Sequence, residues 1–202
     1  MKETPSVRLL PRTPGNLRGR ATLGRLSLAA LEVAEREGVE ATTIDEICRV
    51  AGCSRRTFFH HFPSRDAALL GPAVPSVTPE AVAHYLAEPG RILTGALQLV
   101  DVPPELAPST PLGARRHALL QASPRLQAAA RERMLPAATA VLDAVTAKIA
   151  QLPTLDPATI PQTAQAVTAI VAALIETAFT TGTNDPVATL DSLTPLWHQL
   201  IG

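Results

Sequence analysis

The sequence is poor in aromatic residues and in cysteine. Only 3% of its 202 residues are Phe, Trp or Tyr, whereas 46% are hydrophobic. A core must therefore be built mainly from aliphatic side chains, which favours closely packed helices over strands. The two cysteines, Cys48 and Cys53, are too few for the disulfide framework of a small secreted protein.

Long apolar runs and a net charge are also absent. No apolar stretch is long enough for a membrane span, and residues 1–16 lack the apolar segment of a signal peptide. We therefore expect a cytoplasmic protein with no membrane partner. The formal net charge is zero, which argues against a general nucleic-acid binder. Residues 1–70, however, hold 11 basic against 8 acidic side chains, so this end is slightly basic.

Proline and glycine divide the chain into three parts. Residues 1–16 predict a flexible basic arm, in which Arg12, followed by Arg18 and Arg20, could track a minor groove or simply keep the chain in solution. Residues 17–71 predict short helices over 18–37, 44–51, 55–62 and 65–70. Residues 72–202 predict a larger helical body.

The expected helices of the body begin near residues 80, 90, 112, 125, 161 and 185. Pro136 is expected either to kink one of them or to mark a break in it, and Pro195 to split the last, with Thr194 as a new N-cap. No period-two alternation occurs, so no strand is expected. The sequence thus predicts an all-α fold.

Two short capped helices form the strongest local pattern. Thr43 and Glu46 read as a capping box, in which each side chain bonds to the other residue's amide. Ser54 caps the next helix, and Gly52 permits the sharp turn between the two. The pattern predicts a helix-turn-helix over residues 43–62.

The second helix of this pair has two unlike sides. At 100° per residue Phe58 and Phe62 share one side, and Arg56, Thr57 and His60 lie opposite. Aromatic anchors on one side would hold the helix while the polar side faces a DNA groove. The alternative is an ordinary solvated helix face.

These segments resemble the TetR family of transcriptional regulators. The resemblance covers about residues 18–70 and runs through Ala29–Ala30, Gly38–Ile44, Ile47, Ala51–Ser54 and Thr57–Arg65. It implies a three-helix DNA-binding head on a larger helical C-terminal domain that dimerises and usually holds a small-molecule inducer. The residues that it places near DNA are Thr43, Ser54, Arg55, Arg56, Thr57, Phe59, His60, His61 and Arg65.

Some of these positions carry a more specific expectation. Arg56 is the first candidate for guanine O6 and N7. His61 is either a phosphate contact or a half-buried packing residue. Phe59 stands where the family often has Tyr, so it offers an apolar contact in place of a hydroxyl. Arg65 replaces the usual Lys and keeps a positive charge for a phosphate.

The body carries weaker patterns for a ligand site. An inducer pocket could be lined by scattered polar or bulky side chains, which could equally be core and surface: His84, Tyr85, Arg116, His117, Met134 and Phe179. We expect no catalytic residues and no cofactor, since no Ser/His/Asp set, paired carboxylates or phosphate-binding glycine loop occurs. Cys48 and Cys53 match no zinc spacing, so we interpret them as buried structural thiols, the alternative being a redox or metal sensor.

Two apolar stripes near the C-terminus predict a homodimer through the last two helices. The first stripe comprises Val167, Val171, Leu174 and Ala178, and the second comprises Val187, Leu190, Leu193 and Trp197. Paired with their symmetry mates, the stripes would form a four-helix bundle. Alternatively, they complete the core of a single chain.

Together these patterns predict a non-enzymatic regulator. We expect a ligand-responsive repressor that binds an inverted-repeat DNA operator as a dimer. The rival hypothesis is a helical small-molecule-binding protein or enzyme whose N-terminal head does not bind DNA. The polar side of Arg56, Thr57 and His60 favours the regulator, because an enzyme has no need of it.

Overall fold

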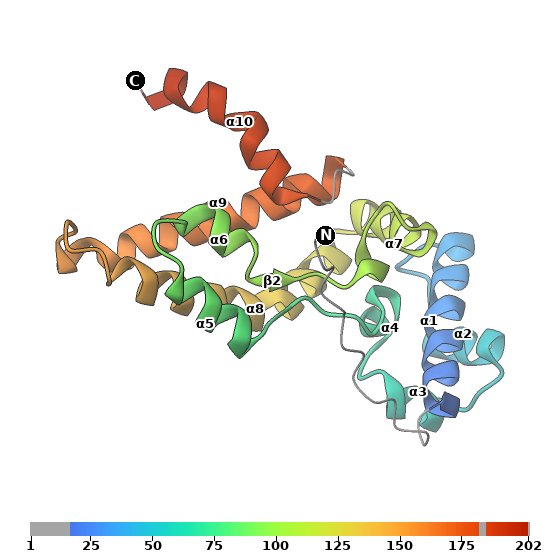
Figure 1. Ribbon diagram of the computed structural model, residues 1–202. Coiled ribbons are helices and arrows are strands. Elements are labelled where there is room, and N and C mark those ends of the chain that lie inside the picture. Colours follow the sequence, from blue (N-terminus) through green and yellow to red (C-terminus); the bar gives the residue numbers. More distant parts are fainter. Residues whose placement is uncertain (1–16, 182–184, 202) are drawn as a thin grey trace, which may run out of the picture.

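The structure is a computed structural model that describes residues 17–181 and 185–201. The arm expected at residues 1–16, with Arg12, lies outside the described residues, as do the side chains of Arg18 and Trp197. The described chain is almost entirely helical, which confirms the predicted fold class (Figure 1).

Four helices form the N-terminal head. They are α1 (Leu17–Glu37), α2 (Ile44–Ala51), α3 (Arg55–His61) and α4 (Arg65–Leu70). The long helix α1 packs against both α2 and α4, and α3 lies at the foot of the head (Figure 1). The largest side chains buried between them are Leu26, Leu31, Ile47, Phe58 and Leu69.

The body is built around one long helix. Its α-helices are α5 (Pro79–Ala87), α6 (Ile92–Leu97), α7 (Pro111–Ala122), α8 (Pro124–Ile149), α9 (Ile160–Thr181) and α10 (Pro186–Ile201). Two short 3₁₀ turns, η2 (Pro104–Leu106) and η3 (Pro157–Thr159), precede α7 and α9. Helices α5, α6 and α9 pack against α8, and α10 packs against α9 and α6.

The chain has two apolar cores, and helix α8 contributes to both. One core holds the buried residues of the head together with Leu119 of α7 and Leu126 of α8. The other holds the body residues around Tyr85, Val145 and Val171. The core of the head is therefore not complete at the end of α4, because Leu119 near the end of α7 and Leu126 near the start of α8 also belong to it.

Two expectations about the body are wrong. A two-residue antiparallel ladder joins β1 (Ser76–Val77) to β2 (Val100–Asp101), and strands this short show no alternation. Helix α10 runs unbroken through Pro195, so Thr194 is no N-cap. Pro195 lies on an exposed side of the helix, where the carbonyl left without an amide partner faces solvent.

Pro136 likewise lies within an unbroken helix. It is exposed on α8, and the buried Val141, Ala144 and Val145 hold the following turns against the body core. A proline in a helix interior costs about 3 kcal/mol, which the packing of a 26-residue helix outweighs.

One stretch in the described part of the chain is long and apolar enough to cross a membrane by length and composition. It is Pro157–Phe179, which includes most of α9. Packed helices of soluble proteins pass the same test. In this fold α9 lies between α8 and α10.

Candidate nucleic-acid interface

Helices α2 and α3 begin and end where their capping residues dictate. Thr43 accepts a hydrogen bond from the Glu46 amide at 3.2 Å, and Ser54 accepts one from the Thr57 amide at 3.1 Å. Gly52 ends α2 in the left-handed conformation with φ 64°, which favours glycine. The predicted helix-turn-helix is confirmed in its caps and its turn.

The capping box is only half formed. The carboxylate of Glu46 does not return to the Thr43 amide but accepts hydrogen bonds from Arg49 and Arg36 at 2.6–2.7 Å. These two guanidinium groups, Arg49 first, lower the pKa of Glu46 to about 2. Glu46 thus joins α2 to α1 rather than closing the N-terminus of α2.

One side of α3 is buried in the head. Phe58 is 0% and Phe62 3% exposed, and their ring centroids lie 6.0 Å apart. The orientation predicted for α3 from its sequence is therefore confirmed. Two rigid aromatic anchors on so short a helix fix its rotation about its own axis.

The opposite side of α3 faces solvent. Arg56 and His60 are exposed, and Phe59 is 49% exposed, an unusual placement for a large aromatic ring. Thr57 is half-buried, with its Oγ1 2.9 Å from Ser54 Oγ. Within the described part of the chain no ion pair engages Arg56, so its guanidinium is available for an outside partner.

Arg55, at the first position of α3, is held by a residue of α2. Its Nη1 donates to both carboxylate oxygens of Asp45 at 2.8 Å. The two side chains remain 58% and 69% exposed. The pair therefore stands on the surface beside the exposed side of α3, and sequence spacing alone gave no sign of it.

Comparison with known proteins supports this geometry. Residues 28–70 match the family model described as bacterial regulatory proteins of the tetR family. The N-terminal head is thus similar to the DNA-binding part of TetR-family regulators. The matched residues comprise the second half of α1 and all of α2, α3 and α4.

This chain is also similar to the HTH-type transcriptional regulator TcmR of Streptomyces glaucescens. The two are 38% identical over 72 residues, which is 35% of this chain and 32% of TcmR. This chain thus spans about a third of the length of the curated relative that it matches.

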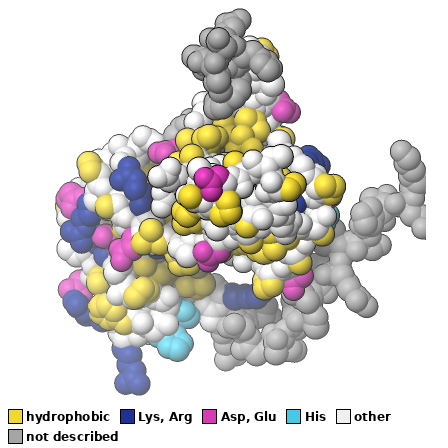
Figure 2. Space-filling model, turned by 90° about the vertical axis from the view of Figure 1, so that its left-hand side faces the viewer, with side chains coloured by type: hydrophobic (Ala, Val, Ile, Leu, Met, Phe, Trp, Pro, Cys, Tyr) yellow, Lys and Arg dark blue, Asp and Glu magenta, His cyan; other side chains and the backbone are white. Residues whose placement is uncertain are grey.

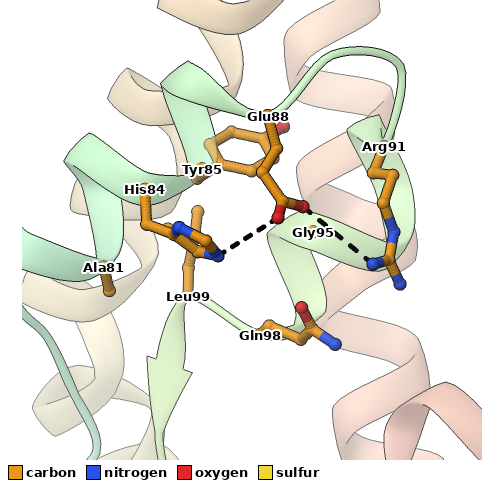
Figure 3. A pocket seen from close by; sticks show the side chains of 8 residues that line it. All are labelled: Ala81, His84, Tyr85, Glu88, Arg91, Gly95, Gln98 and Leu99. Atoms are coloured by element: carbon orange, nitrogen blue, oxygen red, sulfur yellow. Dashed lines mark ion pairs between the residues drawn. The ribbon is translucent and has the colours of Figure 1, made fainter.

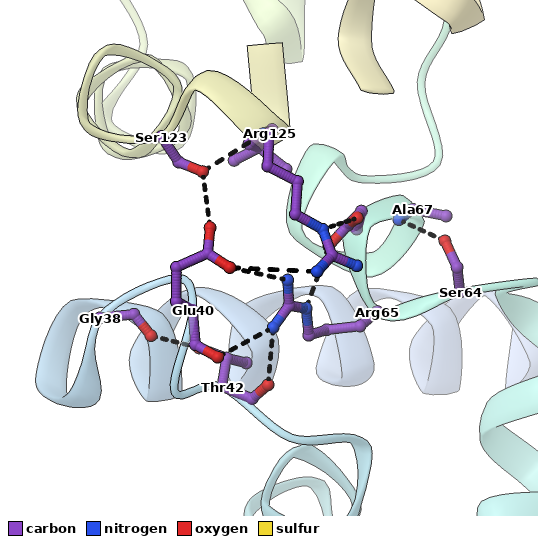
Figure 4. Close-up of polar contacts among 10 residues, drawn as sticks. Gly38, Glu40, Thr42, Ser64, Arg65, Ala67, Ser123 and Arg125 are labelled. Carbon is purple, nitrogen blue, oxygen red and sulfur yellow. Dashed lines mark hydrogen bonds and ion pairs between the residues drawn. The ribbon is translucent and has the colours of Figure 1, made fainter. Parts of the chain in front are cut away.

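Arg65 of the TetR-family head points inward rather than toward solvent (Figure 4). Its side chain is only 14% exposed. Its Nη1 donates to the carbonyls of Glu40 and Thr42 at 3.2 and 3.1 Å, and its Nε donates to Asp66 at 3.0 Å. These contacts tie the start of α4 to the α1–α2 turn, so a structural role is favoured over the expected phosphate contact.

The two histidines at the end of α3 differ in exposure. His61 is half-buried while His60 is exposed, and their rings lie edge to face with centroids 5.1 Å apart. Nearby, Cys48 is buried and Cys53 half-buried. No group of three or more metal-ligating side chains occurs among the residues that the structure describes.

The seam between the head and the body carries polar contacts. Arg115 of α7 binds Glu35 of α1 through two hydrogen bonds of 2.7 Å, which together with the charge of Arg115 lower the pKa of Glu35. Ser123 Oγ donates a hydrogen bond to Glu40 Oε1 at 3.2 Å, and Arg125 Nε donates one to Asp66 Oδ2 at 3.2 Å (Figure 4). These pairs join α7 and α8 to three parts of the head.

The six residues expected to line an inducer pocket do not gather at one hollow. His84 and Tyr85 border a shallow hollow at the end of α5 (Figure 3). Arg116 instead lies buried at the seam, where its Nη2 donates to Ser27 Oγ at 2.7 Å. The remaining three expected residues, which do not line this hollow, are His117, Met134 and Phe179.

The hollow at the end of α5 is small, and hydrogen bonds hold the residues around it. Its volume is about 70 Å³, well below the roughly 300–1,000 Å³ of drug-sized ligand pockets. The Tyr85 hydroxyl donates to the Ile92 carbonyl at 3.0 Å. Buried Lys148 of α8 donates to the carbonyls of Tyr85, Leu86 and Glu88, which sequence reasoning did not anticipate.

Proposed function

We propose that this chain is a transcriptional regulator that binds a DNA operator through α3. The observation that carries the proposal is the division of α3 into a buried and an exposed side. Phe58 and Phe62 lock the helix to the head, and Arg56 and His60 stand free on the other side. A short helix held this way presents its side chains to a major groove in a fixed orientation.

The contacts proposed for α3 divide by chemistry. Arg56 has the donor geometry to reach guanine O6 and N7. His60, Thr57 and the capping hydroxyls of Ser54 and Thr43 suit backbone phosphates, which position a protein without reading sequence. The exposed ring of Phe59 suits a thymine methyl or a deoxyribose.

We further propose that the protein acts as a homodimer, but not through the stripe expected from its sequence. Val171, Leu174 and Ala178 are at most 5% exposed within a single chain, so that stripe completes the chain's own core. The uncovered side of α9 carries small side chains instead: Ala166, Ala169, Ala172 and Ala173. Small residues let two helices approach closely.

The exposed apolar surface of the last two helices supports this dimer. Only 17% of the most apolar stretch of α9 is buried within one chain, and Leu193 of α10 is 41% exposed. Hydrophobic side chains gather toward the top of the face shown in Figure 2, at the height where α10 rises in Figure 1. A second copy would cover this surface and couple two heads for an inverted repeat.

Response to a small-molecule inducer belongs to the same proposal. The hollow beside His84 and Tyr85 is too small for such a ligand as it stands. An inducer that bound at this hollow would have to select a conformation in which the body is more open. Repression would be relieved if that conformation engaged DNA less well.

The proposal is tested by selection from a random DNA library with the full chain. We expect an enriched inverted repeat, and two copies of the chain bound per repeat. The matched control replaces Arg55, Arg56 and His60 by alanine and should enrich no sequence. Absence of any enriched sequence with the natural chain would favour the rival, a helical small-molecule-binding protein or enzyme.

A further inference from the structure

We propose that Asp45 positions Arg55 to recognise a guanine, which makes the pair a specificity device added to α3. The inference rests on the proposed DNA-binding function. The two residues come from different helices of the helix-turn-helix: Asp45 from the first turn of α2, and Arg55 from the first turn of α3. Their contact therefore spans the turn that sets the angle between the helices.

The contact uses only one edge of the guanidinium. Arg55 Nη1 donates to both Oδ1 and Oδ2 of Asp45 at 2.8 Å. In the described part of the chain no acceptor engages Arg55 Nε or Nη2. These two groups form the other fork of the planar guanidinium, and a fork of two parallel N–H donors matches guanine O6 and N7.

Stability does not account for this pair. Both side chains are more than half exposed, and exposed ion pairs contribute little to the folded state because water screens them and both side chains lose freedom. The same pair gains strength when DNA covers it, because water is then excluded and the local dielectric constant falls. We therefore expect the ion pair to stabilise the DNA-bound complex more than the free protein.

The carboxylate restricts which base Arg55 can reach. A free arginine on a DNA-facing surface can turn to a phosphate, which carries no sequence information. Asp45 holds one edge of the guanidinium and repels phosphates, so the other edge remains directed at a base. An adenine in place of guanine would present an amino group at the position of O6, and the guanidinium fork has no acceptor for it.

This arrangement predicts opposite effects on specificity and on general DNA affinity. Replacing Asp45 by Asn removes a negative charge from a DNA-facing surface, so non-specific binding should become about two- to fivefold tighter at low salt. The preference for G·C at one position of each half-site should fall by about tenfold. A residue that merely stabilised the head would lower both together.

The experiment measures binding of the selected operator, its single-base-pair variants and unrelated DNA by D45N, R55A and the double variant D45N/R55A. In the R55A background, D45N should change no base preference. The D45E variant should restore part of the preference. The control is E35Q, which removes one negative charge from the head at the seam with α7 and should leave base preference unchanged. Melting temperatures verify that all variants are folded.

Each failure points to a different conclusion. If the natural chain selects no sequence, the proposed DNA-binding function fails. If it selects a sequence and D45N discriminates equally well, the positioning role of Asp45 is overturned. If D45N lowers base preference even in the R55A background, Asp45 contacts a base itself, for example a cytosine amino group, and the positioning role is again overturned.

Discussion

Gly71, at the end of α4, makes room for the buried guanidinium of Arg116. A Cβ at position 71 would lie 2.5 Å from Arg116 Nη2, and Gly71 has φ 81°. Arg116 is 5% exposed, and burial lowers its pKa. The carbonyl of Gly71 also accepts a hydrogen bond from Arg133 of α8 at 2.9 Å. One glycine thus contacts both helices of the body that face the head.

The variant G71A should therefore be less stable for two reasons. It places a side chain in the left-handed region and displaces a packed guanidinium, which together should lower the free energy of unfolding by about 2–4 kcal/mol in a urea titration. The control is G90A, where φ is 78° but no atom lies within 4 Å of the added Cβ. G90A should lose about 1–2 kcal/mol. Equal losses would show that the contact with Arg116 is unimportant.

The two sides of α3 should respond differently to truncation. F58A removes a ring that is 0% exposed and should lower the free energy of unfolding by about 3–5 kcal/mol. F59A removes a ring that is 49% exposed and should change it by less than about 1 kcal/mol, while weakening DNA binding. Thermal unfolding distinguishes the two. A stable F58A variant would contradict the observed rotation of α3.

Arg56 should contribute directly to operator recognition. We expect R56A to weaken binding by about 1–3 kcal/mol and to relax base choice at one position in each half-site. The control, R131A, removes an exposed charge from α8, outside the head, and should bind the operator as the natural chain does. Unchanged affinity and selectivity in R56A would remove Arg56 from the base-reading residues.

The two thiols should differ in reactivity at pH 8. Burial, with Cys53 adding to it, raises the pKa of Cys48 to about 11, so Cys48 carries almost no reactive thiolate at that pH. An alkylating reagent should label Cys53 first and Cys48 only after unfolding in urea. The C53S variant should be nearly inert while folded. Two rapidly labelled thiols in the native protein would contradict this prediction.

A charge on the small-residue side of α9 should separate the proposed dimer. Ala172 is exposed in a single chain, so A172E should fold, but in a symmetric dimer it would place like charges in a desolvated interface. We expect monomers by sedimentation at micromolar concentration and weak binding to one half-site. The control is A147E on α8, also exposed, which should remain dimeric. A monomeric natural chain would refute the dimer.

Local features of the head could be predicted from the sequence because they depend on neighbouring residues. The caps Thr43, Ser54 and Ser64 each bond to an amide three residues on, and the rotation of α3 follows from Phe58 and Phe62. Such patterns repeat within one helical turn and need no knowledge of the rest of the fold.

Contacts between distant segments could not be predicted in this way. Arg115 and Glu35 are 80 residues apart, and nothing in their surroundings marks them as partners. The same holds for Lys148, whose role depends on where α5 ends against α8. For Arg65 the sequence predicts a phosphate contact because a positive charge near α3 suits one, and only the fold shows the carbonyls to which Arg65 donates.

The division of buried residues between two cores limits how this chain could evolve by recombination. Helices α5 and α6 belong to the body core, yet in the chain they lie between α4 and α7, which both border the head. No single crossover in the gene therefore separates one core from the other. A fusion that joined residues 17–71 to a foreign body would lose Leu119 and Leu126 and expose the apolar surface that they cover. We therefore expect that the head and the body of this chain would have to be exchanged together, or changed by point substitution.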